Sequence, residues 1–255
     1  MRFNWPGLWT LFLKEIRRFT VVFMQTVIAP VVGALLYLFI FSHALSGRVD
    51  VYPGVSYPQF LVPGLMMMTI IQNAFANTSS SLIFSKVTGN IVFVLLAPLS
   101  HLEFYLAFVG AALVRAALVC VGVYLAALIY LGTPVEHPLL LLVFGLLGGL
   151  LLGACGLLAG IWADKFDQVA TVQNFVILPL TYLSGVFYSI HSLPPAWQVL
   201  SRVNPFFYLI DGFRYGFFGH SDVSPWFSVA VMAGANAALC ILCLRLLSSG
   251  YKLRG

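Results

Sequence analysis

The chain has 255 residues, of which 61% are hydrophobic and only 8% are charged, and its formal net charge is +5. This balance excludes an ordinary soluble domain, in which about a quarter of the residues carry charge. The basic residues are spread over several polar segments and form no dense patch, so the positive charge does not indicate a nucleic-acid-binding protein.

Six runs of predominantly apolar residues follow one another along the chain, and each is long enough to cross a bilayer as a helix of about 20 residues. Backbone polar groups in hydrocarbon must be satisfied internally, which predicts helices, whereas a transmembrane β-barrel shows short alternating segments. We therefore predict a single all-α membrane domain over residues 1–255, with six transmembrane helices at 21–41, 60–80, 104–131, 139–162, 169–190 and 226–247.

Residues 1–19 are predicted to form an amphipathic helix in the membrane interface. Apolar side chains recur at helical spacing on one side, and basic side chains fall on the other. This helix either anchors the chain in the lipid surface or also touches a cytoplasmic partner. The apolar set is Leu8, Trp9, Phe12, Ile16 and Phe19, and the polar set is Thr10, Lys14, Arg17 and Arg18.

Residues 81–103 form the long loop between the second and third predicted spans. Within it, residues 90–96 have the composition of a short apolar helix that Pro98 ends. Such a surface is too apolar to stay exposed to water without a partner or lipid. We predict that it docks on a partner protein, although it could instead lie flat on the lipid. The predicted contact residues are Asn90, Val92, Phe93, Leu95, Leu96 and Pro98.

Polar side chains inside the predicted spans are candidates for a translocation path. Arg115 lies near the middle of the third span, where a charge costs at least about 2–3 kcal/mol and must face protein or water. It either lines a path or is a structural arginine bonded to neighbouring helices. The polar stripes of the second and fifth spans have the same two interpretations, as path or as interhelical hydrogen bonds. The candidate path residues are Arg115, Asn73, Asn77, Asn174 and Thr181.

The fourth span carries glycines at a spacing of four, in two sets. Small residues at this spacing let helix backbones approach closely. We predict that they serve packing within the chain, and contact between subunits is the alternative. The two sets are Gly145, Gly149 and Gly153, and Gly156 and Gly160.

Motifs of common enzyme classes are missing from the sequence. There is no Walker A motif and no H-E-x-x-H zinc motif. Ser184-Gly185 is similar to an intramembrane serine nucleophile, but every histidine lies at or beyond a span end, which disfavours a hydrolase. An ion-coupled secondary transporter normally needs acidic or histidine groups inside the membrane, and none lies there. We predict no enzyme, no metal site and no cofactor in this chain.

Basic residues are distributed unequally between the two sides of the predicted spans. Nine lie on the side of the termini and only three on the other, which by the positive-inside rule places both termini in the cytoplasm. Residues 191–225 are then on the outer side. The two sets are Arg2, Lys14, Arg17, Arg18, Lys86, Lys165, Arg245, Lys252 and Arg254, and Arg48, Arg202 and Arg214.

The outer segment 191–225 is rich in proline and aromatic residues, and two short helices, 196–203 and 207–217, fit a partly re-entrant structure. Its motif resembles the signature region of the ABC-2 type permeases, the membrane subunits of bacterial ATP-binding-cassette exporters. The basic N-terminal segment, the six spans and the loop near Pro98 are also similar. The motif residues are Pro194, Pro195, Trp197, Asn204, Pro205, Asp211 and Arg214, with Gln198 and Tyr208 beside them.

The resemblance implies a dimeric permease of the bacterial inner membrane that binds two separate ATPase subunits, which hold ATP and Mg. It also implies that residues 81–103 contain a coupling helix flanked by Lys14, Arg17 and Arg18, and that the first and fifth spans form the dimer seam. The implied function is export of a glycan, lipid-linked or amphipathic substrate from the cytoplasm or inner leaflet. One feature departs from the family: a glutamate usual soon after the position of Asn90 is replaced here by Val92 and Phe93.

Overall fold

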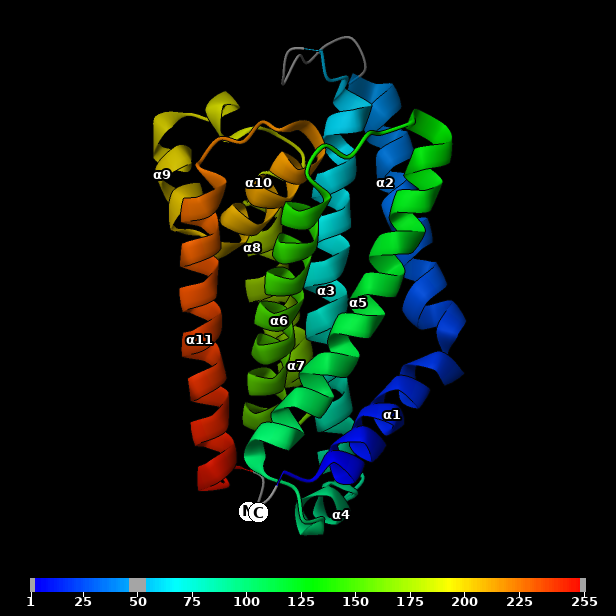
Figure 1. The fold of residues 1–255 in the computed structure, drawn as a ribbon, viewed down its shortest axis with the longest axis vertical. Coiled ribbons are helices and arrows are strands. Elements are labelled where there is room, and N and C mark those ends of the chain that lie inside the picture. The colour runs from blue at the N-terminus through cyan, green and yellow to red at the C-terminus, as the bar shows by residue number, and fades with distance from the viewer. Residues whose placement is uncertain (1–2, 46–53, 253–255) are drawn as a thin grey trace.

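The computed structural model describes residues 3–45 and 54–252, which form a bundle of helices (Figure 1). Long helices run side by side along the bundle, with α9 and α10 gathered at one end and α1 and α4 at the other. The helices are α1 Trp5–Val21, η1 Met24–Ile28, α2 Ala29–Leu45, α3 Tyr57–Val87, α4 Ile91–Leu96, α5 His101–Leu131, α6 Pro138–Trp162, α7 Phe166–Val172, η2 Gln173–Ile177, α8 Leu178–Tyr182, η3 Ile190–Ser192, α9 Pro195–Val203, α10 Pro205–Phe218 and α11 Pro225–Ser249.

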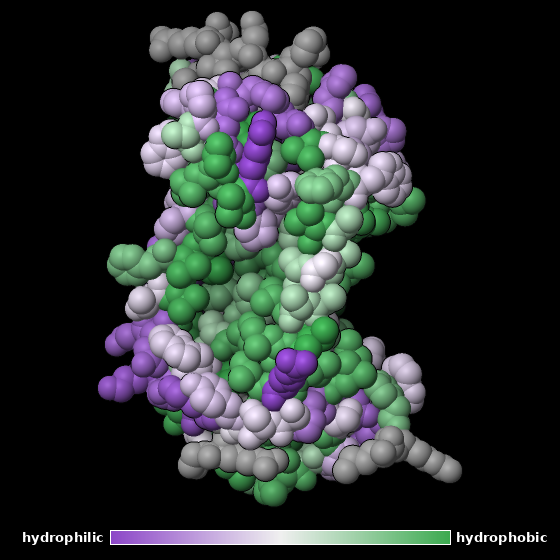
Figure 2. Space-filling model, turned by 90° about the vertical axis from the view of Figure 1, so that its left-hand side faces the viewer, coloured by the Kyte–Doolittle hydropathy of each residue, from purple (hydrophilic) through white to green (hydrophobic). Residues whose placement is uncertain are grey.

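Five helical stretches of the described chain are long and apolar enough to cross a membrane: Met24–Ala44, Tyr57–Val87, His101–Leu131, Pro138–Trp162 and Pro225–Ser249. The helical class and these five predicted spans agree with the structure. On the side where α9 and α11 lie, hydrophobic surface covers the hollowed middle and hydrophilic surface gathers mostly toward the two ends (Figure 2). This distribution fits a bundle whose middle is solvated by hydrocarbon.

The fifth predicted span, 169–190, ends earlier than expected. The chain is helical only over α7, η2 and α8, which together run from residue 166 to 182. At 1.5 Å per residue these 17 positions reach about 26 Å, short of a hydrocarbon core of about 30 Å. The backbone then turns at Gly185, whose φ of +81° lies in the left-handed region. The expectation of one continuous span to residue 190 was therefore wrong.

The loop between the second and third predicted spans is shorter than the expected 81–103. Helix α3 continues to Val87, and α5 begins at His101, so both helices take residues from the expected loop. Each has 31 residues and is about 46 Å long, more than the hydrocarbon thickness. The short helix α4 lies between them, close to its expected position.

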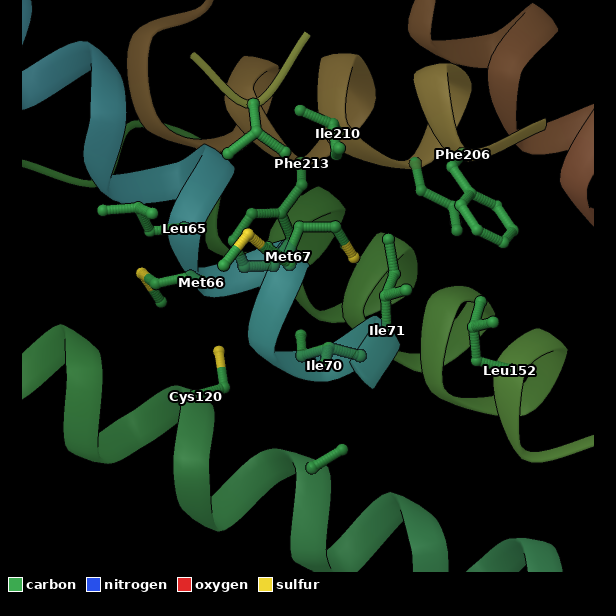
Figure 3. Packing of buried hydrophobic residues seen from close by; sticks show 14 of the residues in the cluster. Leu65, Met66, Met67, Ile70, Ile71, Cys120, Leu152, Phe206, Ile210 and Phe213 are labelled. Atoms are coloured by element: carbon green, nitrogen blue, oxygen red, sulfur yellow. The ribbon is translucent and has the colours of Figure 1, made fainter. Parts of the chain in front are cut away.

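Helix α3 is the centre of the bundle. Most of its side chains are buried on every side of the helix, and the buried set includes polar as well as apolar residues. Figure 3 shows Met67 and Ile71 of α3 among side chains of α6 and α10, while Cys120 points from α5 toward Met66.

The glycines of α6 make room for two different neighbours within the chain. A Cβ at Gly149 or Gly153 would lie 2.4 Å or 3.1 Å from side chains of α5. A Cβ at Gly156 would lie 2.3 Å from the backbone oxygen of Phe75, and one at Gly160 would lie 2.9 Å from Leu82, both on α3. The predicted role of these four glycines in packing within the chain is confirmed. At Gly145, by contrast, an added Cβ would meet nothing closer than 3.6 Å.

Candidate functional site

The short helix α4 lies at one end of the bundle (Figure 1). It presents an uncovered apolar surface. Only Ile91 is buried, whereas Phe93 is 74% and Leu96 is 78% exposed. Of the other predicted contact residues, Val92 and Leu95 are also exposed, and Asn90 caps the helix without a side-chain hydrogen bond. The structure thus places the predicted docking residues together on a surface that nothing in the described chain covers.

Asn4, which precedes α1, forms hydrogen bonds both to the link between α4 and α5 and to the first turn of α5. The Asn4 side chain donates to the backbone oxygen of Pro98 at 3.0 Å, and the Asn4 backbone N–H donates to the Glu103 carboxylate. Glu103 is 1% exposed and also accepts from the Ser100 backbone N–H at 2.6 Å. The sequence interpretation missed Glu103, although the Ser100-x-x-Glu103 pattern is that of a capping box.

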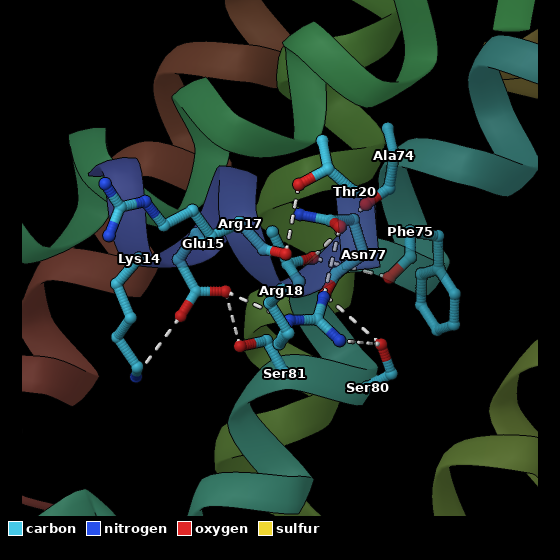
Figure 4. Close-up of polar contacts among 11 residues, drawn as sticks. Lys14, Glu15, Arg17, Arg18, Thr20, Ala74, Phe75, Asn77, Ser80 and Ser81 are labelled. Atoms are coloured by element: carbon cyan, nitrogen blue, oxygen red, sulfur yellow. Dashed lines mark hydrogen bonds and ion pairs between the residues drawn. The ribbon is translucent and has the colours of Figure 1, made fainter. Parts of the chain in front are cut away.

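A second polar cluster joins the end of α1 to α3 (Figure 4). Glu15 is fully buried and accepts from Arg18 Nε at 3.3 Å and from the Ser81 hydroxyl. Arg18 donates to the backbone and side-chain oxygens of Asn77 at 2.8 Å and 3.1 Å, and to Ser80 at 3.3 Å. A buried carboxylate requires such partners to offset its lost hydration. This cluster fixes the orientation of α1 against the bundle.

The predicted faces of α1 need correction. Arg18 was expected on the solvent side with Lys14 and Arg17, but it points into the bundle with Glu15. The reason is that Asn77, Ser80 and Ser81 of α3 give the two charged groups partners that the sequence pattern of α1 alone does not reveal. Trp9, on the apolar face expected to lie in the membrane interface, is 57% exposed, which agrees with contact to lipid.

One stripe of α3 receives polar side chains from two other helices. Arg115 of α5 is 9% exposed and donates to Asn73 Oδ1 at 3.1 Å, one turn along α3 from Asn77, which binds Arg18. Asn73 in turn donates to the Thr69 backbone oxygen at 3.0 Å. Within the described residues Arg115 forms no ion pair with a carboxylate, and its Nε has no partner. Of the predicted path residues, Asn73 and Asn77 therefore lie on this stripe of α3, and Arg115 contacts it from α5.

A third cluster joins α3, α6 and the end of α11. Lys86 donates to the backbone oxygen of Ile161 at 2.9 Å, near the end of α6, and lies 3.7 Å from Asp164. Lys252 contacts the same carboxylate at 2.6 Å. The hydrogen bond from Lys252 holds the pKa of Asp164 below its usual range. Asp164 therefore links the ends of the three helices through its contacts with Lys86 and Lys252.

At the opposite end of the bundle, the polar residues of the outer motif clamp α10 in place. Asn204 caps α10 by accepting from the Phe206 N–H at 3.0 Å, and its amide donates to the Leu180 oxygen at 2.7 Å. Arg214, 1% exposed, donates to the Gly185 oxygen at 2.7 Å and lies 3.9 Å over the Phe60 ring. These contacts join α10 to α8 and α3.

Asp211 completes the clamp by binding the segment after α10. Its carboxylate accepts from the backbone N–H groups of Asp222 and Val223 at 2.8 Å and 3.0 Å. Burial raises the pKa of Asp211 to about 6, although these bonds and Arg214 act in the opposite direction.

Among the motif prolines, Pro195 and Pro205 begin α9 and α10, and Pro194 caps α9. Trp197 is 49% exposed on α9.

Residues 6–218 match the ABC-2 type transporter family over most of the chain. The chain belongs to this family. It is 38% identical over 254 residues to the inner membrane transport permease YadH of Escherichia coli strain K12, covering 100% of this chain and 99% of the relative. It is 28% identical over 228 residues to nodulation protein J of Rhizobium leguminosarum bv. trifolii, covering 86% of this chain and 83% of the relative.

A further similarity covers a part of the chain. The capsule polysaccharide export inner-membrane protein CtrC of Neisseria meningitidis serogroup B is 32% identical over 93 residues, which is 35% of this chain and 32% of the relative. The family resemblance inferred from the sequence is confirmed. The protein is an ABC-2 transport permease with several membrane-spanning helices, and members of this family are permeases rather than enzymes.

In this ABC-2 permease the remaining two predicted path residues lie away from Arg115. Asn174 is exposed on the outer surface of η2, and Thr181 is fully buried but donates to the Ile177 oxygen of its own helix at 2.6 Å. Ser184, considered above as a nucleophile, instead accepts from the Asn204 amide at 2.9 Å. The structure therefore gives Thr181 and Ser184 local structural partners.

We expect the stability of the permease to depend on whether the buried charge of Arg115 keeps its hydrogen-bond partner. Asn73→Leu removes the hydrogen-bond partner that the described residues provide for this buried cation, and should destabilise the permease by about 3 kcal/mol. Arg115→Met removes the cation as well and should cost less, about 1 kcal/mol. Thermal unfolding in detergent measures both. An equal loss for the two variants would contradict this order, and a transport defect in well-folded Arg115→Lys would support a role in the path.

Proposed function

We propose that this ABC-2 permease is the membrane subunit of an exporter driven by a separate ATP-binding-cassette ATPase. The observation that carries the proposal is the uncovered apolar surface of α4, because Phe93 and Leu96 require a partner to leave water. The family, whose members normally work with such an ATPase, gives that partner its identity. Since this chain has no nucleotide motif, ATP and Mg are held by the partner.

The contacts around α4 support a route from the ATPase to the spans. A displacement of α4 reaches α1 and α5 through Asn4, Pro98 and Glu103. From α1 it reaches α3 through Arg18 and Asn77. Lys14 and Arg17 are exposed on the surface of α1, where they flank the docked ATPase. Arg18 instead forms the contact with Asn77 inside the bundle.

Two copies of the permease form the working unit in this proposal. The segment from α7 to α8 serves as the fifth, shortened span and packs with the first span of the second copy. It exposes Asn174, Phe175 and Val176, and Phe175 is 76% exposed. An apolar helix face that carries an exposed amide suits a helix interface better than lipid, since the amide gains a partner there. Asn174 then faces the other subunit and the path.

The topology of this unit has both termini and α4 in the cytoplasm, with α9 and α10 outside. We expect single cysteines at Ser221 and Ser249, in a variant without the four native cysteines, to react with an impermeant thiol reagent from opposite sides of the membrane. Ser221 lies just before the start of α11, and Ser249 is the last residue of that helix. Labelling of both from the same side would refute the arrangement, and labelling after detergent lysis gives the control for total reactivity.

The substrate class is a glycan, lipid-linked or amphipathic molecule moved out of the cytoplasm or the inner leaflet. Names of the relatives support it: one is a capsule polysaccharide export protein, and two others are a nodulation protein and a transport permease. The alternative of an ion-coupled transporter finds less support. The buried acids Glu15 and Asp211 lie outside the five long spans, Glu103 lies in the first turn of α5, and all three already have partners.

The decisive experiment is purification of the permease with its ATPase in nanodiscs. We expect two permease copies and two ATPase subunits by native mass spectrometry, and ATP hydrolysis that depends on the permease. Extracted lipids and glycans identify the cargo by mass. A lone permease that transports in response to an ion gradient and ignores ATP would favour the ion-coupled alternative.

A further inference from the structure

A cavity of about 560 Å³ lies between α3, α5, α6 and α10, apart from the polar stripe and from the α7–α8 face. Met66 and Ile70 of α3 form its back, and Phe213 and Phe217 of α10 close one end. It opens sideways between α5 and α6, where Leu142 is 69% and Leu146 is 52% exposed. Figure 3 shows Met66, Ile70, Cys120 and Phe213 around this region.

The chemistry of the lining excludes water as a stable filling. Apart from the Tyr124 hydroxyl and the Cys120 thiol, the lining side chains carry no polar group, and a buried water needs two to four polar partners. The volume exceeds that of voids normally left in a packed interior. An apolar occupant is therefore required.

The shape of the cavity indicates a thin occupant. On α5 its lining runs from Leu113 to Tyr124, which is about 16 Å along the helix. Over that length, a volume of about 560 Å³ corresponds to an elongated groove rather than a rounded pocket, a shape that suits an extended hydrocarbon chain. A helix of a second copy is the alternative occupant, and the crosslinking arm of the experiment below tests it.

The position of the cavity's opening indicates where its apolar occupant comes from. It lies between two helices long and apolar enough to span the bilayer, and its rim continues directly into their exposed apolar surface. Hydrocarbon chains of membrane lipids are the medium at that surface. We propose that the cavity is a binding site for one acyl chain of a membrane phospholipid, which packs between α5 and α6 as part of the folded permease.

The site can be filled without disturbing its walls. A Cβ at Gly145 lies 3.6 Å from Phe213 and 3.8 Å from Ile70, ordinary contact distances, so Gly145→Leu sends its side chain into the cavity. Ala117→Phe fills it from the opposite wall and serves as the second variant. Gly234→Leu on α11 is the matched control, because a Cβ there meets nothing within 4 Å.

The experiment uses the full chain in vesicles of phosphatidylethanolamine that carries a diazirine in the middle of one acyl chain. After illumination we expect adducts on the segment between Leu113 and Tyr124 in excess over those on α11. In Gly145→Leu and Ala117→Phe these adducts should fall about tenfold, the loss expected when two methylene groups of the chain are displaced. Gly234→Leu should leave them unchanged.

Three outcomes would overturn the proposal. They are equal labelling of α5 and α11 in the parent protein, labelling that persists in both folded filling variants, and protection of α5 by a crosslinked second copy. Thermal unfolding adds an independent measurement. Removal of phospholipid should lower the Tm of the parent and of Gly234→Leu, and should lower that of Gly145→Leu less, because the leucine replaces part of the chain.

Discussion

Replacing Gly156 by alanine should prevent the permease from packing its two central helices. The added Cβ would lie 2.2 Å from Thr78 Oγ1 and 2.3 Å from the Phe75 backbone oxygen. A backbone oxygen cannot move aside as a flexible side chain does, so α3 and α6 must separate. That separation also breaks the bond from the Thr78 hydroxyl to the Gly153 oxygen, now 2.8 Å long. We expect a loss of at least about 3 kcal/mol.

Gly145→Ala is the matched control for this prediction, since it makes the same chemical change on the same helix. Its Cβ meets nothing closer than 3.6 Å. Alanine is the better helix former by about 1 kcal/mol, so this variant should be as stable as the parent or slightly more stable. Thermal unfolding in detergent and the yield of monodisperse protein measure both. Equal melting temperatures for the two variants would show that the close approach of α6 to α3 is not present.

Phe93→Glu should abolish export while leaving the permease folded and inserted. Phe93 is 74% exposed on α4, so its replacement removes no packing within the chain. Docking on the ATPase would bury the ring, and burial of a phenylalanine contributes about 1.5–3 kcal/mol. A glutamate adds the cost of an unpaired charge in the contact. We expect affinity for the ATPase to fall at least tenfold, because each 1.4 kcal/mol corresponds to about a factor of ten.

Affinity measured with the purified ATPase, together with export in cells, tests this prediction. Phe93→Leu is the control, since it keeps an apolar side chain and should retain affinity within a few-fold. The rival hypothesis is that α4 lies on the lipid surface. It predicts that both variants bind the ATPase equally well and that no cysteine placed in residues 90–97 forms a crosslink to the ATPase.

The outer motif illustrates a limit of family resemblance. Its residues identified the family correctly, but the sequence did not indicate which groups they bind. The structure shows Asn204 bound to backbone groups of α8 and α10, and Asp211 bound to the segment after α10. Arg214 is bound to the Gly185 oxygen in the turn that follows α8. Most of these partners are backbone carbonyl and N–H groups, which almost every residue carries, so no sequence pattern could have indicated them.

The sequence by itself determined the membrane class, five of the spans, the apolar helix at α4 and the close packing of α6. All of these depend on composition or on helical period, which are local properties of the chain. The family followed from a motif. The expectations that failed are the end of the span after residue 182 and the direction of Arg18, which points inward. The burial of Glu15 and Glu103 was not predicted.

Only the tertiary structure decided these points, and the reason is the same for each. A charged side chain is buried when distant residues supply its hydrogen bonds, as Ser81 and Asn77 of α3 do for α1 across more than fifty residues. A helix of marginal length ends where the surrounding packing turns the chain, here at Gly185. The acyl-chain cavity also arises from four separate helices. Pairings of this kind are set by the assembled bundle and leave no trace in any single segment.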